Sequence, residues 1–159
     1  MELIRKLASF GALVCDLKQV YITFMRSVCE QSSSVWHSSL TVQNEEDIER
    51  IQKVAFKIIL KENYKSYENA QIILELDTLK CRRIELCLAF AKKCLGNKKM
   101  KALFPANNRT HPMIPRQYEH FQVITAKTER LKKSPIIFMQ NALNQEIERK
   151  MKLNLLWSD

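Results

Sequence analysis

The stretch that decides the fold is residues 17–60, which read LKQVYITFMRSVCEQSSSVWHSSLTVQNEEDIERIQKVAFKIIL. Apolar side chains in its first half recur at alternating steps of three and four residues, which places them on one face of a helix. A strand cannot produce this spacing, because its side chains alternate every second residue. The predicted apolar face consists of Leu17, Val20, Tyr21, Phe24, Met25, Val28 and Cys29.

A second amphipathic helix is predicted after Leu40. Asn44 can cap its start, and the carboxylates of residues 45–47 suit the positive end of the helix dipole. Between the two helices lies the motif Val35-Trp36-His37-Ser38, in which Trp36 is expected to anchor a core and His37 to be a partly buried, hydrogen-bonded side chain. The predicted apolar face of the second helix is Ile48, Ile51, Val54, Ala55, Ile58 and Ile59.

The composition favours a compact, mainly all-α domain. The 159 residues suffice for one core without disulfides or metals, and only 2 glycines and 4 prolines leave few tight turns for a β fold. Further helices are predicted over residues 67–76, over residues 79–95 with Gly96 as a left-handed cap, and from Pro135 after a Ser134 N-cap. We expect a helical core over residues 1–104, a basic irregular loop with one short extended piece over 105–134, and a C-terminal helix over 135–159 that packs on the same domain.

Residues spread over most of positions 3 to 144 show a pattern whose order and spacing are specific. The pattern consists of Tyr21, Arg26, Ser27, Glu30, Val35-Trp36-His37-Ser38, Leu40, Glu49-Arg50-Ile51-Gln52-Lys53, Ala55, Lys57, Ile59, Tyr67-Glu68-Asn69-Ala70, Leu76, Leu79, Arg82-Arg83, Leu86-Cys87-Leu88, Phe90-Ala91, Thr128-Glu129-Arg130-Leu131 and Leu143-Asn144. It resembles the thumb, and the helical region after it, of reverse transcriptases from jockey-like non-LTR retrotransposons. The resemblance implies a thumb-like core that grips a template–primer as the C-terminal fragment of an RNA-directed DNA polymerase.

The chain departs from the family pattern in three places. Ser27 stands where many relatives have proline, and residues 145–159 match nothing in the family. The third departure is the absence of an Asp-Asp pair, because the four aspartates Asp16, Asp47, Asp77 and Asp159 are scattered. Phosphoryl transfer to a primer end requires adjacent carboxylates that hold two metal ions. We therefore expect no catalytic residue, no metal site and no cofactor in this chain.

Positive charge is concentrated in the second half. Residues 1–79 hold 9 Lys+Arg and 11 Asp+Glu, a net charge of −2, whereas residues 80–159 hold 17 and 6, a net charge of +11. Such asymmetry is typical of a polyanion-binding face. The expected partner is the RNA or DNA backbone, without a membrane or a small-molecule substrate. The residues predicted to contact phosphates are Lys80, Arg82, Arg83, Lys98, Lys99, Lys101, Lys127, Arg130, Lys132 and Lys133.

The 5 cysteines include no Cys-x-x-Cys pair, which favours free and mostly buried thiols in an intracellular protein, nuclear or cytoplasmic. Arg5 and Lys6 precede an apolar run, but no cleavage site follows, so we do not expect a secretory signal. Apart from nucleic-acid binding, the sequence is compatible with a helical protein-interaction module or a retrotransposon remnant without function. These alternatives differ in what the basic half contacts, which is nucleic acid in the first case and an acidic protein or nothing in the others.

Overall fold

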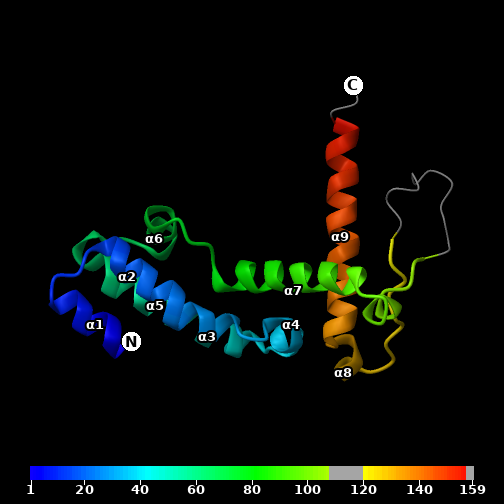
Figure 1. Ribbon diagram of the computed structural model, residues 1–159, viewed down its shortest axis with the longest axis horizontal. Helices are drawn as coiled ribbons and strands as arrows, with labels where there is room; N and C mark the ends of the chain where they lie inside the picture. Colours follow the sequence, from blue (N-terminus) through cyan, green and yellow to red (C-terminus); the bar gives the residue numbers. More distant parts are fainter. Residues whose placement is uncertain (108–119, 157–159) are drawn as a thin grey trace. The chain divides into compact units, whose positions relative to one another are not determined.

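The computed structural model describes residues 1–107 and 120–156 and is mainly α-helical, which confirms the predicted fold class. Figure 1 shows the helices in chain order, coloured from blue to red. The chain divides into unit 1 (Met1–Ser33 and Leu40–Ile84) and unit 2 (Ser34–Ser39 and Glu85–Asp159). The division falls inside the long helix α7 (Leu79–Gly96).

Unit 1 is built around α5 (Val42–Leu60), against which α1 (Glu2–Ser9) and α2 (Val14–Val20) pack (Figure 1). The sequence did not predict α1, yet this helix is amphipathic and buries Ile4 and Ala8. A 3-10 turn over Lys61–Asn63 follows α5. The other elements of unit 1 are a π-helical segment η1 (Tyr21–Arg26), α3 (Ser27–Glu30), α6 (Tyr67–Leu74) and the first residues of α7; α2, η1 and α3 follow one another directly as the first long helix, Val14–Glu30.

The core of unit 1 is apolar and centres on Phe56, whose exposed fraction is 0%. The Phe56 ring lies edge-on to Tyr21, with centroids 5.9 Å apart, and tilted against Tyr67 at 5.7 Å. Aromatic pairs in these geometries stabilise a core beyond the area they bury. The buried apolar residues are Ile4, Ala8, Leu17, Tyr21, Ala55, Phe56, Ile59, Leu60, Ala70, Leu74 and Leu76.

The π-helical segment changes which side chains of the first long helix are buried. The sequence predicts Phe24 and Val28 on the core face, but their exposed fractions are 61% and 68%. A π-helix bonds i to i+5, so its wider turn carries Phe24 off the face that Leu17 and Tyr21 share. Met25 takes its place against the core. The prediction for Phe24 and Val28 was therefore wrong.

Helix α5 begins earlier than the sequence predicted, and its buried face includes the predicted Ala55 and Ile59 but not Ile51. Its N-cap is Thr41, whose hydroxyl accepts a hydrogen bond from the Asn44 amide at 3.2 Å, so Asn44 lies inside the helix. Ile51, predicted to be in the core, is 39% exposed. Gln52 and Phe56, each of which directly follows a residue of the predicted face, are both buried completely.

Unit 2 is built on the second part of α7 and on the long helix α9 (Pro135–Leu156). Pro135 is the first residue of α9, as predicted, whereas Gly96 lies within α7 and does not have a positive φ. The buried core residues of unit 2 are Cys87, Ala91, Cys94, Phe104, Met139 and Leu143. The shorter elements are most of α4 (Ser33–Trp36), a 3-10 turn over His37–Ser39, a 3-10 turn over Met100–Leu103, and α8 (Glu129–Lys132).

The short extended piece predicted near Phe121 pairs with the chain after the 3-10 turn. Ala106 and Phe121 form an isolated antiparallel bridge, with Asn107 N donating to His120 O and Gln122 N to Pro105 O, each at 2.8 Å. Residues 108–119 of the predicted basic loop and the last residues 157–159 of the predicted C-terminal helix lie outside the described residues.

The Val35-Trp36-His37-Ser38 motif belongs to unit 2, although its flanks on both sides belong to unit 1. His37 is 6% exposed, in keeping with its predicted burial, and its ring lies edge-on to Phe138 of α9 at 5.0 Å. The Ser38 hydroxyl donates to the Lys133 carbonyl at 2.8 Å. The motif thus secures the start of α9 and the residues before it.

Candidate nucleic-acid interface

The three predicted phosphate contacts at the start of α7 lie in unit 1, where other contacts occupy them. Lys80 Nζ pairs with Glu45 at 2.8 Å, and Arg82 Nε with Glu30 at 3.3 Å. Arg83 has an exposed fraction of 0%. A guanidinium without exposed surface cannot reach a phosphate of a partner molecule, so Arg83 is removed from the candidate interface.

The burial of Arg83 follows from its position on the buried stripe of α7. Leu79, Arg83, Cys87, Ala91 and Cys94 recur at steps of four and three residues and are all buried. The positive charge of Arg83 lowers the pKa of the Cys29 thiol, although burial dominates and raises that pKa overall. The helical spacing contained the signal for this burial, which the prediction passed over because arginine is seldom buried.

The first basic segment of unit 2 is the lysine turn, residues 97–101, directly after α7. The Asn97 side-chain oxygen accepts hydrogen bonds from the amides of Lys99 at 3.0 Å and Met100 at 3.4 Å. The Asn97 carbonyl accepts a further bond from the Lys101 amide at 2.8 Å. Asn97 therefore caps the turn, and the three lysine side chains at positions 98, 99 and 101 are exposed.

Buried neighbours hold the lysine turn in place. Phe104 is 2% exposed and lies edge-on to Phe121, with centroids 6.2 Å apart. The Cys94 thiol lies 3.9 Å from the Met100 sulfur. The Leu103 carbonyl accepts a 2.8 Å hydrogen bond from the side chain of Gln140 in α9. The lysines thus project from a backbone with a defined position in unit 2.

The second basic segment of unit 2 covers residues 127–133 and contains α8. The Thr128 hydroxyl caps this helix by accepting from the Leu131 amide at 3.2 Å. Lys132 pairs with Glu129 at 2.5 Å, whereas Lys127, Arg130 and Lys133 are exposed and have no ion pair within the described residues.

Six exposed cations remain after paired and buried groups are removed from the ten that were predicted. None of the six forms an ion pair with another described residue. We call them the free cations: Lys98, Lys99, Lys101, Lys127, Arg130 and Lys133.

The net charge of the chain is concentrated in the unit that carries the free cations. Unit 2 contains 14 Lys+Arg and 6 Asp+Glu, a net charge of +8, and unit 1 contains 12 and 11, a net charge of +1. Two further lysines, Lys92 and Lys150, bind Glu146 at 2.8 and 3.2 Å. The hydrogen bond from Lys92 is the main reason that the pKa of Glu146 lies below its usual range.

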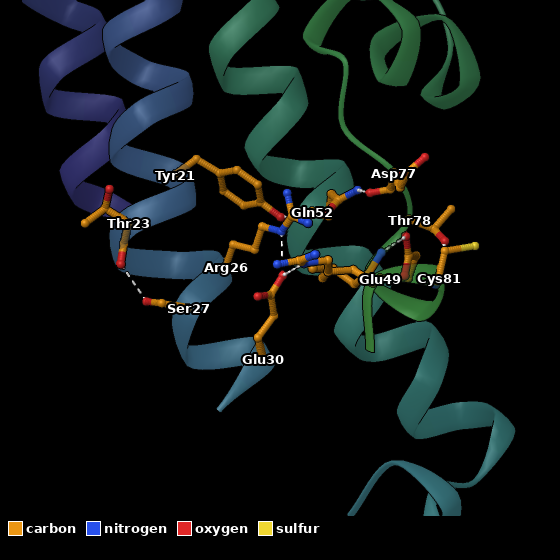
Figure 2. Close-up of polar contacts among 12 residues, drawn as sticks. Tyr21, Thr23, Arg26, Ser27, Glu30, Glu49, Gln52, Asp77, Thr78 and Cys81 are labelled. Carbon is orange, nitrogen blue, oxygen red and sulfur yellow. Dashed lines mark hydrogen bonds and ion pairs between the residues drawn. The ribbon is translucent and has the colours of Figure 1, made fainter. Parts of the chain in front are cut away.

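Unit 1 contains a buried polar network that sequence reasoning did not single out. The Gln52 side chain accepts from the Tyr21 hydroxyl at 2.7 Å and donates to the Asp77 carbonyl at 2.8 Å and to the Tyr67 hydroxyl at 2.9 Å. Tyr67 in turn donates to Glu49. Figure 2 shows Tyr21, Gln52 and Asp77 converging from three parts of the chain. Burial raises the pKa of both tyrosines, and the Glu49 carboxylate raises that of Tyr67 further.

An ion-pair cluster lies beside this network in Figure 2. Glu30 accepts from Arg26 at 2.6 Å and from Arg82 at 3.3 Å. On the outer side of the same helix, the hydroxyls of Thr23 and Ser27 donate to the carbonyls of Gln19 and Thr23, at 2.9 and 2.6 Å. These bonds satisfy backbone carbonyls around the π-helical segment. Each of these contacts joins parts of unit 1 to one another and therefore serves its packing.

Within the described residues, no three His, Cys, Asp or Glu side chains gather closely enough to hold a metal ion. The helices of that part of the chain include none that combines the length and apolar character needed to cross a membrane. Of the five thiols, Cys87 and Cys94 are buried, Cys29 is half-buried, and Cys15 and Cys81 are exposed, fewer buried than the sequence suggested. Comparison of the chain with protein-family models, curated proteins and solved structures found no match.

Proposed function

We propose that this chain is a nucleic-acid-binding module, in which the free cations of unit 2 contact the phosphate backbone of RNA or DNA. The observation that carries the proposal is that six exposed cations lie on two capped segments without a carboxylate partner among the described residues. Nucleic acid carries a layer of condensed counterions. Exposed and unpaired cations can neutralise its phosphates, and the counterions that are then released drive binding.

The resemblance to the thumb region of non-LTR reverse transcriptases supports a narrower form of the proposal. In that form the ligand is an RNA–DNA template–primer, and the chain positions it without performing chemistry. The polar residues on which the resemblance rests include Tyr21, Gln52 and Tyr67, which form the buried network of unit 1. The resemblance would then describe how unit 1 packs, while unit 2 supplies the contacts to phosphate.

A salt titration tests the proposal. The logarithm of the affinity for a short labelled RNA–DNA hybrid is expected to fall linearly with the logarithm of salt concentration. For each phosphate neutralised, the affinity should fall by about 0.9 log units per tenfold rise in salt. Base sequence is expected to matter little, because phosphate contacts carry no sequence information. A triple variant of the lysine turn, Lys98→Gln with Lys99→Gln and Lys101→Gln, is expected to make the slope shallower by up to about 2.7 units.

The matched control removes an equal number of positive charges from unit 1, by Arg5→Gln, Lys6→Gln and Lys65→Gln. These three side chains are exposed, so both triple variants are expected to stay within about 0.5 kcal/mol of the wild-type stability. Only the lysine-turn variant is expected to change the slope. A flat titration of the wild-type chain, or equal slopes for both variants, would contradict the proposal and favour a protein-interaction module.

A further inference from the structure

Gln140 occupies an unusual position for a neutral polar side chain. It lies on α9 with an exposed fraction of 0%, and each end of its amide bonds to a different backbone segment. Its Nε2 donates to the Leu103 carbonyl at 2.8 Å, and its Oε1 accepts from the Ile124 amide at 3.2 Å. A buried amide is costly unless both ends find partners, and here both do.

The two partners of Gln140 adjoin the two basic segments of unit 2. Leu103 lies two residues after Lys101, the last residue of the lysine turn. Ile124 lies three residues before Lys127, the first residue of the second basic segment. A residue extends a chain by at most about 3.6 Å, so neither basic segment can move far from its bond to Gln140. One side chain therefore holds the backbone just after the first group of free cations and just before the second.

Asn144 extends this arrangement by one helical turn. Its side-chain oxygen accepts from the Phe121 amide at 2.7 Å, and its nitrogen donates to the Phe121 carbonyl at 2.9 Å. The side chain thus satisfies both backbone groups of Phe121, as a neighbouring strand would. Gln140 and Asn144 lie four residues apart, on one face of α9, and together fix the extended piece that leads to the second basic segment.

We propose that Gln140 and Asn144 are positioning residues, which hold the two basic segments in one arrangement before nucleic acid binds. This inference rests on the proposed function. A preformed set of cations binds more tightly than a mobile set, because the ordering of side chains and loops on binding opposes association. Neither residue carries charge, so their contribution is separable from that of the lysines.

The variant Gln140→Met tests the inference, because methionine has a similar length and cannot form either hydrogen bond. Affinity for the labelled RNA–DNA hybrid is expected to weaken about tenfold, through the ordering that must then accompany binding. The salt slope is expected to become shallower although no charge is lost, because fewer cations reach phosphates together. Hydrogen exchange at the Ile124 amide is expected to become faster.

The matched control is Gln52→Met, since Gln52 is also 0% exposed and likewise loses the hydrogen bonds of a buried amide, but in unit 1. It is expected to lower the melting temperature while leaving affinity and salt slope unchanged, both measured below the melting transition of each variant. Equal losses of affinity in both variants would overturn the inference, because general destabilisation would then account for the effect.

The outcomes separate this inference from the proposed function. A wild-type chain that binds with a steep salt slope, together with a folded Gln140→Met variant that binds identically, overturns the role of Gln140 and leaves the proposed function standing. A flat wild-type titration rejects the proposed function itself. If Gln140→Met does not fold, Asn144→Ala loosens only the Phe121 attachment, and wild-type affinity and slope in that variant would overturn the inference.

Discussion

The Tyr21 hydroxyl donates a 2.7 Å hydrogen bond to Oε1 of Gln52, across 31 positions of sequence. The Gln52 amide nitrogen donates to the Tyr67 hydroxyl and to the Asp77 carbonyl. One hydrogen-bond network therefore connects the first long helix with α5, α6 and the residues just before α7. Every polar group of the Gln52 side chain has a partner. Fully satisfied networks of this kind favour one packing arrangement over its competitors, because each alternative leaves a buried group without a partner.

The two network tyrosines make unit 1 sensitive to alkali. Burial raises the pKa of Tyr21 and Tyr67 above the usual value of 10.0. The two tyrosines are neutral in the folded protein and stabilise it fully at a pH below the unfolded-state pKa of about 10. This stabilisation is lost as the pH rises from that value through the raised pKa of the folded state. Urea unfolding at about pH 8 and about pH 11 is expected to show this loss.

The variant Tyr21→Phe is expected to reduce that loss. It should also lower the free energy of unfolding at neutral pH by about 1–3 kcal/mol, because Oε1 of Gln52 loses its donor. Tyr64→Phe is the control, since the Tyr64 hydroxyl makes no hydrogen bond with the described residues. An alkaline transition that is the same in wild type and Tyr21→Phe would show that this phenol does not contribute.

Truncation of two phenylalanines in unit 1 is expected to change stability by very different amounts. Phe56 is 0% exposed and contacts two aromatic rings, so Phe56→Ala should lower the free energy of unfolding by about 3–5 kcal/mol. Phe24 is 61% exposed, so Phe24→Ala should change it by about 0.5 kcal/mol or less. Denaturant titrations of both variants measure the difference. A large effect at Phe24 would place that side chain in the core after all.

Glu146 is expected to make unit 2 sensitive to acid. Its hydrogen bonds from Lys92 and Lys150 lower its pKa, so the stabilisation is present above the unfolded-state pKa and is lost as pH falls through the folded-state value. Glu146→Gln should reduce stability at neutral pH and flatten the acid dependence. Urea titrations from neutral pH to about pH 3 check this, with the exposed Glu62→Gln as control. Parallel acid profiles for wild type and Glu146→Gln would contradict it.

The isolated chain is expected not to extend a primer on an RNA or DNA template with magnesium or manganese. Its four aspartates are never adjacent in the sequence, and the reaction requires neighbouring carboxylates to hold two metal ions in line with the attacking oxygen. Incorporation of labelled nucleotides measures this activity. Template-dependent incorporation by the highly purified protein would contradict the expectation.

Local sequence signals were sufficient to predict most of the helices. The segment from Pro135 onward has proline at the first helical position, and apolar residues recur at helical spacing over residues 84–95. The helix faces were harder to predict. Phe24 was misplaced because the π-helical segment changes the number of residues per turn, and no pattern of apolar residues announces such a change.

The candidate interface shows the same division between local and tertiary information. The clusters of lysine were visible in the sequence, and the exposure of Lys98, Lys99 and Lys101 agrees with the usual behaviour of that residue. The attachment of those lysines to Gln140 could not be seen, because it joins residues 37 positions apart through a backbone carbonyl. Backbone groups are the same at every position, so a sequence cannot indicate which of them a buried amide will select.

The placement of residues 34–39 has a consequence for the order in which the chain folds during synthesis. Ser38 must wait for Lys133, 95 residues later, before its hydrogen bond can form. At a ribosomal rate of about 5–20 residues per second, that interval lasts on the order of 5–20 s. Over this time His37 has been synthesised without Phe138 of α9, whose ring packs against it. Unit 1 can acquire its structure first, whereas unit 2 can fold only after most of the chain has been synthesised. Residues 34–39 are therefore available to chaperones during that interval.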